Sequence, residues 1–207
     1  MAVHLVSHPL AQDALASLRD ARTAPGRFRR LAARLSLLLA AEALKDLPTE
    51  TTAVQTPLGP ADARRVTGDV VVVPVLRAGL GMLEAVLELI PWARVGHIGL
   101  RRDEATAIAS RYYTRLPSNI ESSYVLMVDP MLATGGSAVD AIQVLADAGA
   151  RDIRILCIVA APEGIATVEA AHPDVRIYTP VIDKGLNEHK FIVPGLGDFG
   201  DRLYGTE

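Results

Sequence analysis

The sequence predicts an α/β fold in which a parallel β-sheet is covered by helices on both faces. Val70–Val75 and Tyr124–Val128 are apolar without alternation, as in strands that are buried on both sides. Each is followed by a segment in which apolar residues recur at helical spacing, which indicates a strand–helix repeat. The 207 residues are 50% apolar and contain no long linker, so we expect a single domain over 1–207.

The chain before the core sheet is predicted to be mostly helical. Residues 1–45 are expected to form N-terminal helices, because Leu10–Leu18 and Phe28–Leu44 repeat apolar residues at helical spacing. Residues 46–69 contain Thr, Pro, Gly and alternating charges, which are typical of short strands and turns. The core sheet is therefore expected over 69–180.

Within the core, strands are predicted to alternate with helices. The strands are expected at Val70–Val75, Arg94–Leu100, Tyr124–Val128, Ile153–Val159 and Val175–Tyr178, and the helices at Gly79–Leu89, Ser137–Ala148 and Glu163–Ala171. Gly149 stands where a glycine commonly ends a helix. Right-handed crossovers place the C-terminal ends of the strands at one edge of the sheet, where ligands bind in such folds. Residues 181–207 hold five glycines and little helical periodicity, so we expect a looped extension close to that edge.

Composition argues against several classes of function. The net charge is −3 and only 4% of residues are aromatic, which does not favour a nucleic-acid interface. The histidines show no metal-ligand spacing, and the single cysteine, Cys157, lies in an apolar run where a core side chain is expected. Because no apolar segment is long enough for a membrane span and no signal pattern is present, we expect a cytoplasmic protein without membrane contact.

The most informative segment follows a buried strand and leads through glycines into a helix. It consists of Asp129, Pro130, Met131, Leu132, Ala133, Thr134, Gly135, Gly136 and Ser137. The free N–H groups of a first helical turn form an anion site, and the two glycines let a phosphate approach the backbone. Asp129 lies about one sugar ring away, where a carboxylate can bind two ribose hydroxyls and stabilise positive charge. Thr-Gly-Gly-Ser alone would also fit a helix cap, but the complete strand–acid–loop pattern favours a phosphate site.

Two basic elements follow other predicted strands. Arg77-Ala78-Gly79 lies in a strand–turn–helix order, and a guanidinium there suits the oxygens of a pyrophosphate. By itself such a turn is more often an ordinary surface loop. It indicates a pyrophosphate site because it is expected next to the Asp129–Ser137 segment, which we call the phosphate loop. Arg101-Arg102-Asp103-Glu104 follows the Arg94–Leu100 strand, and it precedes a segment, to about Ile120, that we expect to be a flap. Such alternating charges are otherwise typical of a solvated loop.

The Asp129–Ser137 segment resembles the signature with which type I phosphoribosyltransferases bind 5-phospho-α-D-ribose 1-diphosphate (PRPP). Most of that family has two acidic residues at the strand end, and Asp129 followed by Pro130 is the form of its uracil-specific branch. The resemblance covers nearly the whole chain and is sharpest at Val73–Met82, Asp129–Ser137 and Ile192–Asp201. It implies a type I phosphoribosyltransferase-like fold with a C-terminal hood. It also implies the conversion of uracil and PRPP to UMP and pyrophosphate in pyrimidine salvage.

The same resemblance implies roles for individual residues. The implied PRPP-binding residues are Arg77, Ala78, Gly79, Arg102, all nine residues of Asp129–Ser137, and Asp198. The implied uracil-binding residues are Ile192, Gly197, Asp198 and Phe199. Backbone groups of such a glycine-bearing segment can match the acceptor–donor–acceptor edge of uracil, which cytosine lacks. Arg77 and Asp129 are expected to act in catalysis through charge and position.

Two positions depart from the family pattern. Arg101 stands where the family has tyrosine, which leaves open whether Arg101 or Arg102 contacts the pyrophosphate. Phe191 also stands where tyrosine is usual, so any role for that hydroxyl is missing here.

The resemblance also implies a cofactor and partners. Mg²⁺ is expected on the pyrophosphate of PRPP without a direct protein ligand, with Asp198 reaching it through water. A homodimer or larger homo-oligomer is implied, and GTP is a candidate effector near the N-terminal helices, where Arg27, Arg29, Arg30 and Arg34 form a basic cluster. Two alternatives stay open. One is a relative that uses hypoxanthine, guanine or orotate, and the other is a regulator that keeps the fold and binds RNA.

Overall fold

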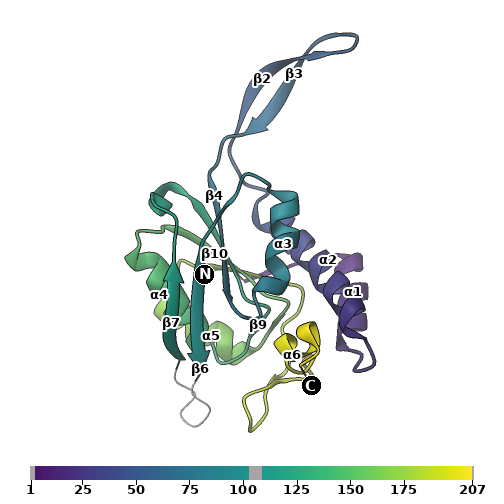
Figure 1. The fold of residues 1–207 in the computed structure, drawn as a ribbon, viewed down its shortest axis with the longest axis vertical. Helices are drawn as coiled ribbons and strands as arrows, with labels where there is room; N and C mark the ends of the chain where they lie inside the picture. The colour runs from purple at the N-terminus through teal and green to yellow at the C-terminus, as the bar shows by residue number, and fades with distance from the viewer. Residues whose placement is uncertain (1–2, 103–108, 207) are drawn as a thin grey trace.

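The computed structural model describes residues 3–102 and 109–206, and its centre is a mostly parallel eight-stranded β-sheet (Figure 1). The strand order is β1-β12-β10-β8-β4-β6-β7, with β5 paired to β4. The strands are β1 (Val3–Leu5), β4 (Val70–Leu76), β5 (Arg94–Val95), β6 (His97–Arg102), β7 (Ala109–Arg115), β8 (Tyr124–Val128), β10 (Asp152–Leu156) and β12 (Arg176–Thr179). Neighbouring strands are parallel except for β6 and β7, which form an antiparallel edge. The predicted α/β class is confirmed.

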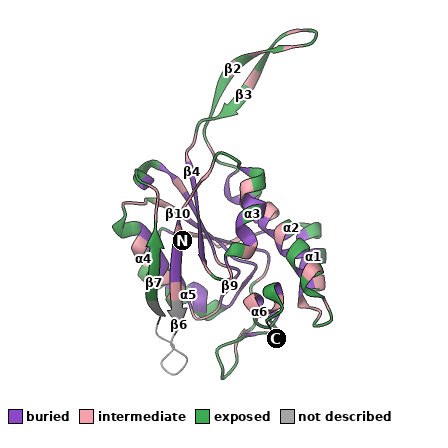
Figure 2. Cartoon of the chain, in the orientation of Figure 1, coloured by how far each residue is buried: buried purple, intermediate pink, exposed green. Residues whose placement is uncertain are grey.

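Helices cover both faces of this sheet. They are α1 (Pro9–Arg19), α2 (Pro25–Ala43), α3 (Leu80–Leu89), α4 (Gly136–Asp147), α5 (Pro162–Ala171) and α6 (Phe199–Tyr204). Val70 and Val72 of β4 pack with α1, α2 and α3, whereas Val71 and Val73 pack with α4 and α5. The run of valines is continuous because both faces of the strand are buried, as Figure 2 shows for the central strands. Within the described ranges, no helix is long and apolar enough to cross a membrane.

Several short elements differ from the sequence prediction. Residues 1–45 were expected to be helical, but they also contain β1, whose three residues are too few to show a periodicity. The predicted strands Arg94–Leu100 and Ile153–Val159 are each divided in two, the second into β10 and β11 (Val159–Ala160), which pairs with β9 (Met131–Leu132). The expected flap contains β7, which pairs with β6. The tail forms α6 and the short pair β13 (Gly185–Leu186) and β14 (Ile192–Val193), where only loops were expected.

Two local predictions are confirmed. Cys157 is fully buried, and burial raises the pKa of its thiol to about 12, so the thiol stays protonated at neutral pH. Gly149 follows α4 with φ of 95°, a conformation that residues with a Cβ rarely adopt.

A two-stranded hairpin projects from the body of the molecule (Figure 1). It consists of β2 (Thr49–Thr56) and β3 (Gly59–Val66), and its residues are exposed or half-buried along both strands. Figure 2 shows this exposure, and Leu58 at the turn is fully exposed. At the base, the N–H of Thr67 donates to the carbonyl of Pro48 at 3.0 Å. An isolated two-stranded hairpin is marginally stable in water, so a partner surface would stabilise this one.

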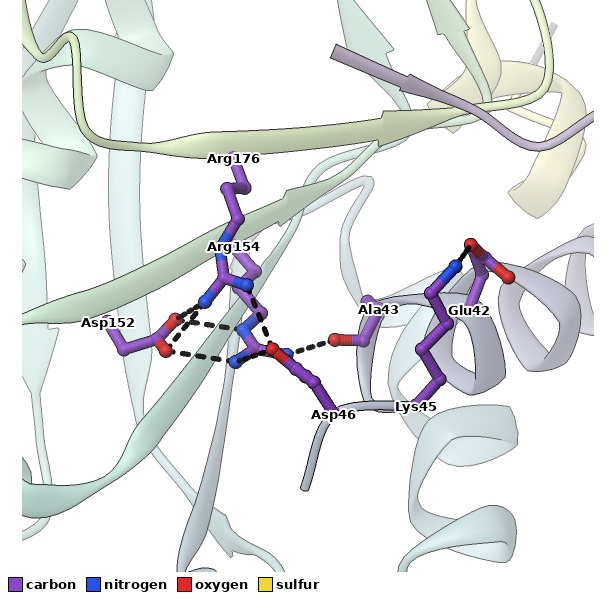
Figure 3. A network of polar contacts seen from close by, with 7 residues as sticks. All are labelled: Glu42, Ala43, Lys45, Asp46, Asp152, Arg154 and Arg176. Atoms are coloured by element: carbon purple, nitrogen blue, oxygen red, sulfur yellow. Dashed lines mark hydrogen bonds and ion pairs between the residues drawn. The ribbon is translucent and has the colours of Figure 1, made fainter. Parts of the chain in front are cut away.

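A network of paired charges joins the end of α2 to the edge of the sheet where the central strands begin (Figure 3). Arg154 of β10 is fully buried, and its guanidinium donates to Asp152 at 2.8 Å, to Asp46 at 2.5 Å and to the carbonyl of Ala43. Arg176 of β12 donates to the same two carboxylates, at 2.6 Å and 3.0 Å. Burial alone would raise the pKa of each carboxyl, but the hydrogen bonds from the two guanidinium groups lower it.

Candidate active site

The loop that follows β8 is held closely against the first turn of α5. The N–H of Ala161 donates to the carbonyl of Leu132 at 2.8 Å, next to the β9–β11 pair. Gly135 has φ of 85°, and a Cβ on it would lie 2.7 Å from the carbonyl oxygen of Gly164. A Cβ on Gly164 would in turn lie 2.5 Å from the carbonyl oxygen of Ala133. Both glycines are therefore required by the packing of the loop on α5.

Gly136 differs from these two glycines because, among the described residues, no contact requires a glycine there. It opens α4 with helical geometry, and no atom lies within 4 Å of the position that its Cβ would take. The N-cap is Gly135, which offers no side-chain acceptor, and the first turn of α4 carries no acidic residue. The helix-cap alternative is therefore not what the described residues form. The first N–H groups of α4 keep their capacity to bind an anion, next to the hydroxyls of Thr134 and Ser137.

Asp129 directly follows β8 and is half-buried at the start of this loop. Desolvation raises the pKa of its carboxyl to about 7, against the smaller opposing effect of the N–H of Met131. No cationic side chain in the described part of the chain forms an ion pair with it. A carboxylate in such a position is available to a ligand, which can donate hydrogen bonds to it or place positive charge beside it.

A cavity of about 250 Å³ lies between the phosphate loop and the C-terminal tail. Its lining residues are Asp129, Met131, Leu132, Ala133, Thr134, Gly135, Ser137, Ala138, His189, Lys190, Phe191, Ile192, Gly197, Asp198 and Phe199. Seven predicted PRPP residues of the loop and all four predicted uracil residues thus face one space. Pro130 and Gly136 belong to the same loop but are not lining residues of this cavity.

The arginine turn lies beside this cavity rather than in its wall. Arg77 is exposed, the Leu76–Arg77 peptide bond is cis, and the hydroxyl of Tyr204 donates to the carbonyl of Arg77 at 3.2 Å. A Cβ on Gly79 would lie 2.4 Å from the carbonyl oxygen of Val128, so the turn packs directly on the end of β8. Arg77, Ala78 and Gly79 therefore adjoin the phosphate loop, as their neighbouring strands require. Arg102 ends β6, but its side chain lies outside the described residues, as do residues 103–108 of the predicted flap.

The tail reaches the cavity through a backbone with unusual geometry. The Val193–Pro194 peptide bond is cis, and Gly195 and Gly197 have φ of 58° and 82°. Asp198 is exposed and caps α6, its carboxylate accepting from the N–H of Asp201 at 2.9 Å. Ile192, Leu196 and Phe199 are buried, so they anchor this segment, whereas Val193, Pro194, Gly197 and Asp198 are exposed.

Four cavity residues were not among the predicted site residues, namely Ala138, His189, Lys190 and Phe191. His189 is exposed and lines the cavity together with Lys190. The N–H groups of His189 and Phe191 both donate to the side chain of Asn187, at 3.0 Å and 2.9 Å, which shapes this loop. The available signal was the position of His189 and Lys190 next to Phe191 in the predicted base-binding tail.

Comparisons with known proteins show the family of the chain. The chain matches the family model described as uracil phosphoribosyltransferase over residues 5–206. It is 52% identical to a uracil phosphoribosyltransferase from Dictyoglomus thermophilum, over 99% of this chain and 100% of the relative. It is 50% identical to one from Shouchella clausii, over 99% of each chain.

Solved structures have a similar fold. The AQ2163 protein from Aquifex aeolicus is similar with a TM-score of 0.94 and 37% identity, over 100% of this chain and 99% of that chain. A hypoxanthine-guanine phosphoribosyltransferase from Bacillus anthracis has a TM-score of 0.53 and 11% identity, over 77% of this chain and 80% of that chain. At that identity, the second likeness shows the fold alone.

Proposed function

This chain belongs to the uracil phosphoribosyltransferase family, and we propose that its reaction takes place in the cavity between the phosphate loop and the C-terminal tail. The protein is an enzyme that transfers the ribose 5-phosphate of PRPP to uracil, giving UMP and pyrophosphate. One observation carries the proposed location. A single cavity is bounded on one side by a helix N-terminus without a cap and on the other by a glycine-bearing segment of irregular backbone.

The phosphate loop is the proposed site of the 5-phosphate and ribose of PRPP. The N–H groups of the first turn of α4 and the hydroxyls of Thr134 and Ser137 would bind the phosphate oxygens. The free space beside Gly136 supports this, because it lets a phosphate contact the backbone. Asp129 would accept hydrogen bonds from the two ribose hydroxyls.

The tail is the proposed site of uracil. Ile192, Gly197, Asp198 and Phe199 line the cavity opposite the loop, and backbone groups there would bind the O2, N3–H and O4 edge. Cytosine reverses the donor and acceptor at N3 and at the 4-position. Each mismatch would leave a buried polar group unpaired at about 1–3 kcal/mol, so cytosine should be rejected.

The proposed chemistry depends on position and charge. The bond between uracil N1 and the anomeric carbon forms as the bond to pyrophosphate breaks, with positive charge developing on the ribose ring. The N1 proton of uracil passes to the departing pyrophosphate or to water. Asp129 lines the cavity and would stabilise that charge, while Arg77 and Arg102 would bind the departing pyrophosphate. No protein nucleophile is needed for this displacement.

Mg²⁺ fits the donor set of this site as an ion held mainly by the substrate. Among the described residues, no group of three or more His, Cys, Asp or Glu forms a metal cage. Asp198 is exposed on the cavity, and we propose that it would hold the ion through water while pyrophosphate oxygens provide direct ligands. The bound ion would neutralise charge on the pyrophosphate.

We propose that the protein is a homo-oligomer in which the β2–β3 hairpin packs on a second copy. Leu58 at its turn is fully exposed, and Val66 and Trp92 at its base are 42% and 56% exposed. A hollow beside Trp92, lined also by residues 65–69, adjoins the hairpin. Replacing 49–66 by a short linker between Pro48 and Thr67 should convert the oligomer to a smaller species in light scattering. An unchanged mass would refute this role for the hairpin.

We also propose GTP as an effector that binds the basic face of α2. Arg27 and Arg30 are exposed there, and Arg34 lies 3.7 Å from Asp13 in an exposed pair. Arg29 donates to the carbonyl of Leu203 at 2.7 Å, so α2 contacts the helix that follows the proposed uracil segment. GTP added to the assay should change the uracil KM or kcat. Identical kinetics with and without GTP would refute it.

The central test compares bases as acceptors. The protein is incubated with PRPP and Mg²⁺ and with uracil, cytosine, hypoxanthine or orotate, and pyrophosphate and nucleotide are measured. We expect UMP and pyrophosphate with uracil alone, and no turnover when Mg²⁺ is omitted. A Gly197→Val variant should raise the uracil KM, because its backbone conformation and position belong to the proposed base site. Equal kinetics for this variant would place the base elsewhere.

A further inference from the structure

A largely buried ion pair joins the last residue of α1 to the beginning of the C-terminal tail. The guanidinium of Arg19 binds the carboxylate of Asp183 through two hydrogen bonds, at 2.6 Å and 2.9 Å. The Asp183 side chain is 4% exposed and that of Arg19 is 23% exposed. Because removing two charges from water offsets much of their attraction, such a pair contributes little net stability compared with apolar packing. The pair is therefore more informative for the position in which it holds the chain than for its stability.

The same two side chains also bind both backbone groups of Gly195. Arg19 donates to the carbonyl of Gly195 at 2.7 Å, and the N–H of Gly195 donates to Asp183 at 2.8 Å. Gly195 has φ of 58°, and a Cβ on it would lie 2.2 Å from the carbonyl oxygen of Ile192. The ion pair therefore holds a tight turn at one residue in the middle of the proposed uracil segment.

A second arginine fixes the next residue. Arg202 donates to the carbonyl of Leu196 and to that of Leu18, both at 2.6 Å, and to the carbonyl of Asp20 at 2.7 Å. Its guanidinium also lies over the ring of Phe28, 4.7 Å from the ring centre. Consecutive carbonyls of the tail are thus directed toward the end of α1 by two guanidinium groups.

We propose that Arg19 and Asp183 are positioning residues for uracil recognition, acting with Arg202. They direct the carbonyls of Gly195 and Leu196 toward α1. Because a peptide unit is planar, this orientation sets where the N–H groups of Leu196 and Gly197 point, and the N–H of Asp198 follows in the next peptide unit. Gly197 and Asp198 line the cavity, and in the described part of the chain no hydrogen bond is found for their N–H groups. These N–H groups are then free for the oxygens of uracil. The inference rests on the proposed placement of uracil at the tail.

The test separates affinity for uracil from affinity for PRPP. The double variant Arg19→Met, Asp183→Asn removes the pair without leaving a single buried charge. Loss of a charge-assisted hydrogen bond predicts a rise of roughly tenfold or more in the uracil KM, with the PRPP KM within about twofold of wild type. Arg19→Lys keeps the charge but cannot form two parallel hydrogen bonds to the carboxylate. Its uracil KM should therefore lie between that of wild type and that of the double variant. Arg22→Met is the matched control, because Arg22 is exposed and its side chain, within the described ranges, binds only Asp20.

The outcomes distinguish this inference from the proposed site. If Gly197→Val raises the uracil KM and the double variant does not, the positioning role is wrong while the base site stands. If Gly197→Val also leaves the uracil KM unchanged, the base site itself is wrong. A double variant that shifts both KM values equally, with a lower melting temperature, would indicate a general structural role and overturn the inference.

A measurement on the unmodified protein keeps the inference testable if the variants do not fold. Amide hydrogen exchange should show the N–H of Gly195 protected without ligand, since it donates to a buried carboxylate. The N–H groups of Gly197 and Asp198 should exchange fast and become protected only when uracil or UMP is added. Fast exchange at Gly195, or protection of all three before ligand is added, would overturn the inference.

Discussion

The replacement of Gly136 by alanine separates the demands of the fold from those of the ligand. Gly136 opens α4 with helical geometry, and the position of its Cβ is empty to 4 Å. Alanine should therefore fit the folded protein without strain. A Gly→Ala change at a compatible site stabilises by about 0.4–1 kcal/mol, because it restricts the unfolded chain. For a chain of this length, that corresponds to a rise of about 1–4 °C in Tm.

The same methyl group should weaken PRPP binding. It would occupy the space through which a phosphate reaches the first N–H groups of α4. Loss of one hydrogen bond to a charged group is worth about 1.5–3 kcal/mol, which corresponds to a rise of roughly 10- to 150-fold in the PRPP KM. The variant should thus be more stable and less active than wild type.

The assay pairs a thermal melt with initial rates at varied PRPP. Gly26→Ala is the matched control, because Gly26 lies in the first turn of α2 and also has no atom within 4 Å of its Cβ position. The control should gain similar stability and keep its PRPP KM. If Gly136→Ala kept the wild-type PRPP KM, phosphate would not approach this face of α4. If it unfolded the protein, our account of Gly136 as a ligand-imposed glycine would be wrong.

Three further predictions concern charged residues. Asp129→Asn should lose most of its turnover. Desolvation raises the pKa of Asp129 to about 7, so wild type should lose stability relative to this variant as pH rises from 4 to 7. Urea unfolding of both proteins at pH 5 and pH 8 would measure this. An equal difference in unfolding free energy at the two pH values would contradict it. Arg154→Met should destabilise by about 1.5–3 kcal/mol, because Asp46 and Asp152 lose hydrogen bonds to one guanidinium but keep those to Arg176, while KM values of the folded fraction stay unchanged. The pKa values of Asp46 and Asp152 are lowered, so their contribution is present above about pH 4 and lost as pH falls below it, and acid unfolding should begin at higher pH in that variant. Arg77→Ala should lose activity at the pyrophosphate end with uracil affinity nearly intact; near-wild-type turnover at saturating PRPP would refute that role.

The sequence predicted those parts of the fold in which one physical requirement acts over many residues. The valines of β4 form a continuous run because two helical layers cover the strand, and the long α2 shows its buried face by spacing. β1 and α6 are too short for such a pattern, and α6 buries only Phe199 and Leu203. β7 is exposed from Arg111 to Arg115, so its pairing with β6 leaves no hydrophobic alternation to detect.

The candidate site was predictable where a short, continuous segment carries a common type of phosphate site. A strand that ends in an acid and a glycine loop that opens a helix are visible within nine residues, from Asp129 to Ser137. The support of the tail was not predictable in this way. Arg19 and Asp183 lie 164 positions apart, and either alone resembles an ordinary surface residue until the fold brings them together. Long-range contacts of this kind leave no periodic signal in a single sequence.

Among the described residues, the charges at the start of the central strands are paired and the carboxyl at their end is not, and this difference bears on how the enzyme works. Where the strands begin, Arg154 is buried between two carboxylates, so each charge has its partner within the protein. Where they end, Asp129 is desolvated with no ion-pair partner in the described residues, and its raised pKa records the free-energy cost of ionising it. That cost falls when a ligand donates hydrogen bonds to the carboxylate or places positive charge beside it. The ribose hydroxyls would donate hydrogen bonds in the bound state, and the ribose ring would place positive charge beside the carboxylate as pyrophosphate departs. An acid left without a partner by the fold is therefore stabilised more as the reaction proceeds, which is the condition for lowering the barrier rather than only binding the substrate.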